Sequence, residues 1–218
     1  VPFITKDNFL AFDSPSTASS KMLANFETPI QATAVEKLEA AGAISIGKAN
    51  LDAFAHGGST ENSAFGVTKN SVDQTRVAGG SSGGSAVAAA LDIVPFTLGT
   101  DTGGSIRQPA SFNGVYGVKP TYGTVSRFGV VAMASSTDTI GVFTKTAKEA
   151  ELVMRIMSGL DKKDMNTLPD FWQEVDAPKK AKIGVVKEFM GEGVDPEVQK
   201  ITENYIEKMR NAGHEIRE

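Results

Sequence analysis

Two serine-bearing glycine loops lie close together in the sequence, between positions 77 and 109. The first reads Gly-Gly-Ser-Ser-Gly-Gly-Ser over 79–85, and the second reads Asp-Thr-Gly-Gly-Ser over 101–105. Glycine pairs let the backbone approach a ligand closely and adopt conformations that other residues avoid. We expect the loops to face each other across a short helix and strand, which gathers hydroxyls and free backbone N–H groups into one pocket. Such a pocket suits acyl transfer to a serine or the binding of an anion.

A serine hydroxyl is a weak nucleophile until a base removes its proton. Histidine is the usual base, but the sequence holds only His56, in a glycine-rich segment, and His214, near the last residue. Lysine can replace histidine where it is buried, because desolvation disfavours the charged form. Lys6 directly follows an apolar segment and is therefore the candidate base. The alternative interpretation is an exposed lysine at the end of a strand.

The second loop has the donors that an oxyanion hole needs. Thr102, Gly103 and Gly104 place consecutive backbone N–H groups just before Ser105. Donors aimed at a developing oxyanion are often the largest single contribution to the catalysis of acyl transfer. A plain glycine turn between a strand and a helix is the alternative interpretation of this segment.

Other glycine-loop motifs fit less well. Residues 79–83 match the G-x-S-x-G elbow of the α/β-hydrolases, but that motif needs an acid and a histidine downstream, and only His214 follows. Neither loop has the lysine of a Walker phosphate-binding loop, and the sequence lacks the Rossmann G-x-G-x-x-G pattern. A non-catalytic nest of backbone donors that binds an anion stays open as an alternative.

Strands and helices alternate along the predicted chain, which indicates an α/β fold. Helices are predicted over 31–41, 86–91, 146–157 and 195–213, and strands over 1–4, 43–46, 93–98, 182–186 and 214–218. Gly42 is in the position that ends a helix, Thr146 and Glu149 fit a capping box, and Asp195 with Pro196 fits a helix start. Residues 57–73 and 161–180 are predicted to be loops.

Composition excludes several classes of function. The 218 residues are 40% hydrophobic and carry a net charge of −4, so the chain has no basic surface of the kind that binds nucleic acid directly. The sequence has no cysteine, which excludes disulfides and thiolate metal sites, and its two histidines are too few for a histidine metal cluster. No apolar run is long enough to span a membrane. We expect a cytoplasmic location, no bound metal, and a single domain over 1–218 that is truncated at both ends.

Long, ordered stretches of the sequence resemble the amidase signature family. The stretches are GGSSGGSAVAAA over 79–90 and LGTDTGGSIRQPASFNGVYGVKPTYG over 98–123, with VPFITKDN at the start. Three further stretches resemble the family branch that serves tRNA-dependent amidotransferases: GKANLDAFAHGGSTENSAFGVTKN, VSRFGVVAMASSTDTIG and VKEFMGEGVDPEV. The resemblance covers residues 1 to about 213. It implies an amidase signature fold, in which helices cover both faces of a mixed central sheet.

The resemblance also implies a Ser–cis-Ser–Lys triad. Ser105 would be the nucleophile, Ser81 would relay the proton through a cis peptide at the Gly80–Ser81 bond, and Lys6 would be the base. Backbone N–H groups of Thr102, Gly103 and Gly104 would form the oxyanion hole. Ser82 and Ser85 are interpreted as structural serines. Asp101 and Arg107 are interpreted as residues that brace the second loop.

The implied reaction hydrolyses glutamine and passes ammonia to a partner. In that branch, the partner B subunit uses ATP and magnesium to amidate Glu-tRNA(Gln) or Asp-tRNA(Asn), and a small C subunit completes a heterotrimer. This chain would bind no cofactor itself, and its glutamine-recognition residues stay unidentified. Two alternatives remain: a stand-alone amidase that acts on small carboxamides, and an inactive fragment or anion-binding module.

Overall fold

A five-stranded mixed sheet forms the centre of the first of two structural units. The structure is a computed structural model that describes residues 1–12, 14–169 and 179–218. The two units, Val1–Gln173 and Glu174–Glu218, are described separately. Whether the whole chain acts as a single domain stays a prediction.

The strand order of the sheet brings Lys6 and the second glycine loop to the same end of two adjacent strands. The strands are β1 (Pro2–Lys6), β2 (Ile44–Ala49), β3 (Phe96–Asp101), β4 (Tyr116–Val118) and β5 (Thr139–Thr144), in the order β2-β1-β3-β5-β4. β1 pairs in parallel with β2 and with β3, whereas β5 is antiparallel to β3 and β4. Because adjacent parallel strands end at the same edge, β1 and β3 carry Lys6 and Asp101 to one place.

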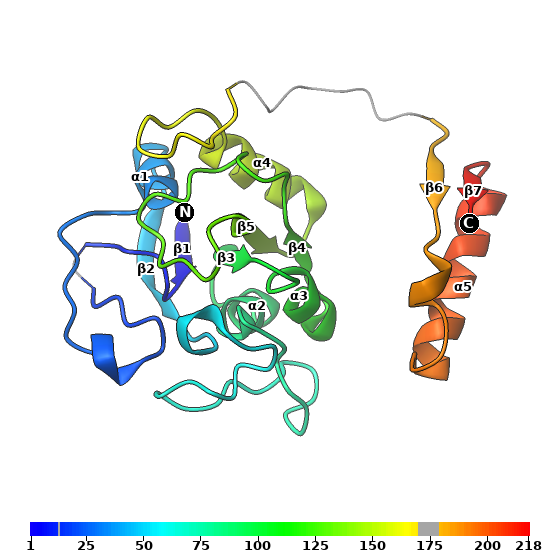
Figure 1. Cartoon of the computed structure of the whole chain (residues 1–218), viewed down its shortest axis with the longest axis horizontal. Coiled ribbons are helices and arrows are strands. Elements are labelled where there is room, and N and C mark those ends of the chain that lie inside the picture. The colour runs from blue at the N-terminus through cyan, green and yellow to red at the C-terminus, as the bar shows by residue number, and fades with distance from the viewer. Residues whose placement is uncertain (13, 170–178) are drawn as a thin grey trace. The chain divides into compact units, whose positions relative to one another are not determined.

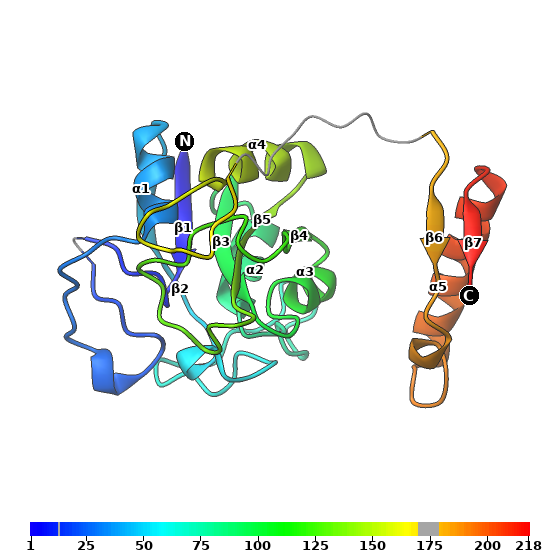
Figure 2. The same ribbon diagram turned by 45° about the horizontal axis from the view of Figure 1, so that its top comes forward.

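Helices cover both faces of this sheet, as Figure 1 and Figure 2 show. α1 (Thr33–Ala40) packs on α4 (Ala147–Met157), which lies on β5, while α2 (Gly83–Ala90) and α3 (Arg107–Asn113) pack together with α2 on β3. Side chains alternate along β5: Val142 joins the core with α1 and α4, and its neighbour Phe143 joins the core with α2 and α3. The predicted mixed sheet with helices on both faces is confirmed.

The larger of the two cores fills the space under α1 and α4. Phe3 of β1 and Phe96 of β3, which are register partners, stack with ring centroids 5.2 Å apart. The fully buried side chains around them include Phe9, Val35, Leu98, Val142, Met154 and Met157. This packing fixes β1 and β3 side by side, and so fixes the ends of the strands that carry the site.

Three predicted helix ends are confirmed. Gly42 has a φ of +87° after α1, a left-handed conformation that suits glycine. The Thr146 hydroxyl accepts from the Glu149 N–H while the Glu149 carboxylate accepts from the Thr146 N–H, which completes the capping box of α4. Asp195 caps α5 (Pro196–Asn211), with its side chain accepting from Glu197 N–H.

Several boundaries differ from the prediction. The first strand runs through Lys6 rather than ending at residue 4. α2 begins at 83 rather than 86, and β3 begins at 96 rather than 93, because the Ile93 N–H still bonds to the Ala88 carbonyl at the helix end. The helix α3 was not predicted. As predicted, residues 57–73 form a loop, with only an isolated bridge at Lys69. Residues 161–169 also form a loop with an isolated bridge. The rest of that predicted loop, 170–178, lies outside the described residues.

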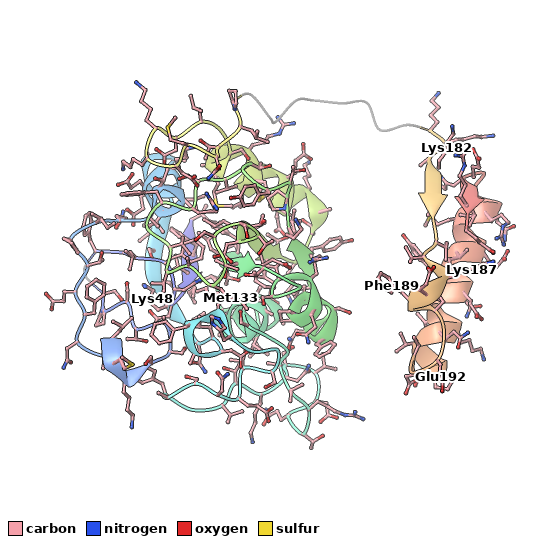
Figure 3. The ribbon with its side chains drawn as sticks, viewed as in Figure 1. Lys48, Met133, Lys182, Lys187, Phe189 and Glu192 are labelled. Atoms are coloured by element: carbon pink, nitrogen blue, oxygen red, sulfur yellow. The ribbon has the colours of Figure 1, made fainter. Side chains whose placement is uncertain are left out.

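The second unit is a small α/β unit. Its strands β6 (Lys182–Gly184) and β7 (Glu215–Arg217) are parallel, and α5 connects them in sequence. Lys187, labelled in Figure 3, pairs with Glu218 at 2.6 Å. The predicted strands and helix are confirmed with shorter bounds. Among the helices of the described residues, none combines the length and the apolar character that crossing a membrane requires.

Candidate active site

Lys6 is the last residue of β1, and its side chain is fully buried. Its Nζ lies 2.8 Å from Ser81 Oγ and 2.8 Å from Thr100 Oγ1, and 3.4 Å from the Thr100 carbonyl oxygen. The three contacts join β1, the first glycine loop and the end of β3. The alternative of an exposed strand-end lysine is therefore wrong.

Burial changes the proton affinity of this lysine. Desolvation lowers the pKa of Lys6 from 10.5 to about 7, against the opposing charges of three carboxylates, those of Asp52, Asp101 and Asp138. A large fraction of the amine is therefore neutral near pH 7. A neutral amine 2.8 Å from a serine hydroxyl can accept its proton.

The first glycine loop is held by bonds from its own backbone. The peptide between Gly80 and Ser81 is cis. The N–H of Gly80 donates to Gln108 Oε1 at 2.8 Å, and the Ser81 carbonyl accepts from the Asp52 N–H at 3.2 Å. These contacts hold Ser81, which is fully buried, against Lys6.

Three further donors of the first loop are also used inside the protein. The Ser82 N–H donates to the Ser105 carbonyl at 3.2 Å, and the Gly83 and Gly84 N–H groups donate to Thr60 Oγ1 and to the Asn50 carbonyl. These three N–H groups are therefore not available to a bound anion. The Ser82–Ser105 bond does join the two loops, as the sequence predicted.

The serines interpreted as structural are confirmed as such. Ser82 Oγ donates to the Thr100 carbonyl at 3.1 Å, and Ser85 Oγ donates to the Leu98 carbonyl at 2.9 Å. Both side chains are fully buried. They attach α2 and its preceding loop to β3.

Asp101 braces the second loop, as predicted. Its carboxylate accepts from the backbone N–H groups of Gly104 and Ile106, and it forms two bonds with the Arg107 guanidinium at 3.1 and 3.0 Å. Burial raises the pKa of Asp101, but the bonds from Arg107 and from the backbone outweigh it, so that the pKa lies below its ordinary value. The carboxylate stays charged and fixes the loop.

The oxyanion-hole prediction needs one correction. The N–H of Gly104 is donated to Asp101 Oδ1 at 2.8 Å and is not free for a substrate. Within the part of the chain that the structure describes, the N–H groups of Thr102, Gly103 and Ser105 have no acceptor. A Cβ built on Gly103 meets nothing within 4 Å, so the loop borders open space. Room for a substrate and free donors therefore occur together here.

Ser105 lies next to this open space and is 9% exposed. Its Oγ has no hydrogen-bond partner among the described residues, so the hydroxyl is not committed to a bond within the protein. The structure therefore brings Lys6 and Ser81 into direct contact. Ser105 is linked to them only through the backbone bond from Ser82.

Several neighbours of Lys6 were missed by the sequence analysis. Thr100 bonds to Lys6, and Asn8 Nδ2 donates to Thr100 Oγ1 at 3.1 Å. Asp52 and Asp138 act on Lys6 through charge. Asn8 and Thr100 could have been found because each lies one or two residues from the end of a strand that carries a candidate residue.

A cavity of about 240 Å³ lies beside the site, with Thr100 and Asp138 in its wall. Asp138 accepts from Thr102 Oγ1 at 2.6 Å and from the N–H of Met133, a residue labelled in Figure 3. Arg127 and Asp164, which also line the cavity, form an ion pair at 2.8 Å, and the Arg127 hydrogen bonds lower the pKa of Asp164 to about 2. The cavity wall is therefore charged and held by its own bonds.

The histidines have other partners. His56 Nδ1 lies 2.7 Å from the Phe54 carbonyl, and His214, in the second unit, accepts from the Ala181 N–H. Neither contacts a serine of the two loops in the described structure. This agrees with the sequence-based preference for lysine over histidine as the base.

Comparison with known proteins gives the same family at three levels. The family Amidase matches residues 1–218. The A subunit of the glutamyl-tRNA(Gln) amidotransferase of Gloeobacter violaceus is 51% identical over the whole of this chain and 46% of its own length. This chain thus spans about half the length of the curated relatives it matches.

Solved structures agree with the sequence relatives. The crystal structure of the glutamyl-tRNA(Gln) amidotransferase A subunit from Thermotoga maritima is 43% identical with a TM-score of 0.93, over 100% of this chain and 49% of that one. The allophanate hydrolase of Kluyveromyces lactis is 34% identical with a TM-score of 0.90, over 99% of this chain and 35% of that one. The fold is thus shared with these proteins, and the chain belongs to the amidase family.

Proposed function

We propose that this chain carries the glutamine-hydrolysing centre of a tRNA-dependent amidotransferase. The observation that supports it most is the contact of 2.8 Å between Lys6 Nζ and Ser81 Oγ, at an amine whose pKa is lowered to about 7 by burial. The relatives in which the whole of this chain matches at about half identity are named as the A subunit of that enzyme.

In the proposed reaction, Ser105 Oγ attacks the side-chain carboxamide carbon of glutamine. The Ser105 proton passes to Ser81, and the Ser81 proton passes to Lys6. The carbonyl oxygen becomes an oxyanion, which the N–H groups of Thr102, Gly103 and Ser105 stabilise. Lys6 then returns the proton through Ser81 to the leaving nitrogen, which departs as ammonia. Water hydrolyses the resulting ester on Ser105 and releases glutamate.

The proposal includes partners that use the ammonia. A B subunit would consume ATP with magnesium to activate Glu-tRNA(Gln) and then amidate it, and a C subunit would complete a heterotrimer in the cytoplasm. The net charge of −4 favours tRNA binding through the partner rather than through this chain. The same ammonia would also serve if the partner amidates Asp-tRNA(Asn).

The test is ammonia release from glutamine by the full-length protein, with and without the B and C subunits, ATP and Glu-tRNA(Gln). Stimulation by the partners and the charged tRNA supports the proposal. Rapid hydrolysis of simple carboxamides without partners would instead identify a stand-alone amidase. The absence of hydrolysis under every condition would contradict both enzymes and favour a binding module.

Variants test the residues of the centre. Ser105→Ala and Lys6→Ala are each expected to lower turnover by roughly 10⁴-fold or more, because the members of such a unit act together. Ser85→Ala is the matched control, since Ser85 is a buried serine that bonds to the Leu98 carbonyl. A serine-reactive probe should label the parent and Ser85→Ala but not Ser105→Ala. Full labelling of Ser105→Ala would overturn the assignment of the nucleophile.

A further inference from the structure

We propose that Thr100, held in place by Asn8, is a positioning residue that stabilises Lys6 in the protonated state it reaches during the reaction. The inference rests on the function proposed above, because it requires Lys6 to act as the base. Thr100 is 3% exposed and lies one residue before the aspartate that braces the second loop.

The oxygen atoms around Lys6 match an ammonium better than an amine. Three acceptors surround Nζ: Ser81 Oγ and Thr100 Oγ1, each at 2.8 Å, and the Thr100 carbonyl at 3.4 Å. An ammonium has three N–H bonds to fill them, whereas a neutral amine has two N–H bonds and a lone pair. Thr100 supplies two of the three acceptors. Protonation of Lys6 therefore turns its contact with Ser81 into a third donated bond and makes all three bonds charge-assisted, which strengthens those to Thr100.

Asn8 fixes the hydroxyl that makes one of these contacts. Its Nδ2 donates to Thr100 Oγ1 at 3.1 Å and lies 3.5 Å from the Val131 carbonyl. Since a carbonyl oxygen only accepts, the amide nitrogen belongs on this side. Asn8 is 1% exposed, and its Oδ1 has no hydrogen-bond partner in the described part of the chain. The bonds that Nδ2 donates are therefore the polar interactions that hold this buried amide, and one of them orients the Thr100 hydroxyl.

Other charges near Lys6 stay in place when Thr100 is changed. Carboxylates face it from the segments after β2, at the end of β3 and before β5, and they are Asp52, Asp101 and Asp138. On the neighbouring strand β2, Ala49 is the register partner of Lys6, and Lys48 pairs with Asp7 instead. α2 has no titratable residue. A change in the pH profile of a Thr100 variant therefore reports the loss of its hydroxyl.

The test measures kcat and KM for glutamine hydrolysis against pH in the full-length protein. Thr100→Val removes the hydroxyl but keeps the shape of the side chain. Because the ammonium loses an acceptor, the midpoint of the rising limb should move to lower pH by about one unit, and kcat should fall about 10- to 100-fold with a smaller change in KM. Thr100→Ser keeps the hydroxyl and should restore most of the parent's kcat and pH midpoint.

Thr97→Val is the matched control, because Thr97 is a buried threonine on the same strand whose hydroxyl bonds to the Ser85 carbonyl at 2.8 Å. It should leave kcat and the pH midpoint unchanged. An unchanged midpoint and kcat in Thr100→Val, or a Thr100→Ser that is as slow as Thr100→Val, would overturn the inference. Lys6→Ala separates the two proposals. Full turnover in Lys6→Ala would contradict Lys6 as the base. An inactive Lys6→Ala together with a Thr100→Val of normal activity would contradict only the role of Thr100.

Discussion

Thr5 is a buried threonine whose hydroxyl bonds to nothing in the described structure. It lies in β1 immediately before Lys6, is fully buried, and its Oγ1 has no hydrogen-bond partner there. Successive side chains of a strand point to opposite faces, so Thr5 and Lys6 lie on different sides of the sheet. The buried hydroxyl of Thr5 therefore lowers stability without taking part in the site.

Thr5→Val is expected to raise the free energy of unfolding by about 1 kcal/mol, because valine has nearly the same shape and removes an unsatisfied polar group. Denaturant unfolding of the parent and the variant at pH 7 measures the difference. Thr97→Val is the comparison, since it breaks a bond of 2.8 Å to the Ser85 carbonyl and is expected to lower stability. Destabilisation of Thr5→Val as large as that of Thr97→Val would contradict the interpretation.

The sequence pointed to Lys6 through its place after an apolar strand, and the family resemblance implied Ser81 and Ser105; the structure brings Lys6 and Ser81 into contact, and the catalytic roles of all three residues stay predictions. The sequence does not show which backbone N–H groups of the second loop are already hydrogen-bonded within the protein. The carboxylate of Asp101 takes the Gly104 N–H, and that pairing depends on how the loop folds back. Thr100 was missed because its bonds to Lys6 and to Asn8 join the ends of β3 and β1, two strands that are far apart in the sequence and paired only in the fold.

At the scale of elements, α2 lies unusually close to the segment that follows β2. A Cβ built on Gly84 would lie 2.5 Å from the Asn50 carbonyl oxygen and 2.6 Å from the Asn50 nitrogen. Both are backbone atoms and cannot rotate away. The close approach lets the Gly84 N–H bond to the Asn50 carbonyl at 3.1 Å, and so attaches the first turn of α2.

Gly84→Ala is expected to lower the free energy of unfolding by about 2 kcal/mol, because the clash outweighs the higher helix propensity of alanine. Gly47→Ala is the matched control, since a Cβ on Gly47 in β2 meets nothing within 4 Å. Its effect should stay within about 1 kcal/mol and favour the folded state. Denaturant unfolding of both variants gives the comparison, and equal stabilities would show that α2 can move away from Asn50.

Element positions followed from the sequence where local signals were strong. The caps of α1, α4 and α5 agree with the prediction because capping depends on a few adjacent residues. The start of β3 and the presence of the helix α3 could not be predicted from the sequence. Ile93 reads as a strand residue but bonds back to the end of α2, and α3 is a short helix that packs on α2 and β4. A local bond at the helix end decided the first, and tertiary packing decided the second.

For the molecule as a whole, the burial of Lys6 couples stability to pH. Its pKa is about 7 when folded and near its ordinary value of 10.5 when unfolded, so between these values the unfolded chain holds a proton that the folded chain lacks. The free energy of unfolding should therefore rise with pH across this window, by up to about 1.4 kcal/mol per pH unit from this group.

The comparison of the parent with Lys6→Met isolates this contribution. Denaturant unfolding at pH 6 to 10 should find Lys6→Met more stable at pH 7, with the difference shrinking as the pH rises toward 10. The other lysines are present in both proteins and cancel. Stability curves that run parallel over this range would show that burial does not lower the pKa of Lys6.

The sealed position of Lys6 also has a kinetic consequence. A base with no exposed surface does not meet bulk water directly and can exchange its proton only through the groups that it contacts, such as the Ser81 hydroxyl. In the proposed reaction, the proton that Lys6 receives during the attack is the one that leaves with the nitrogen. The same proton is then taken up and given back within the site. Departure of the ammonia returns Lys6 to its neutral form, and no acid from the solvent is needed for this step.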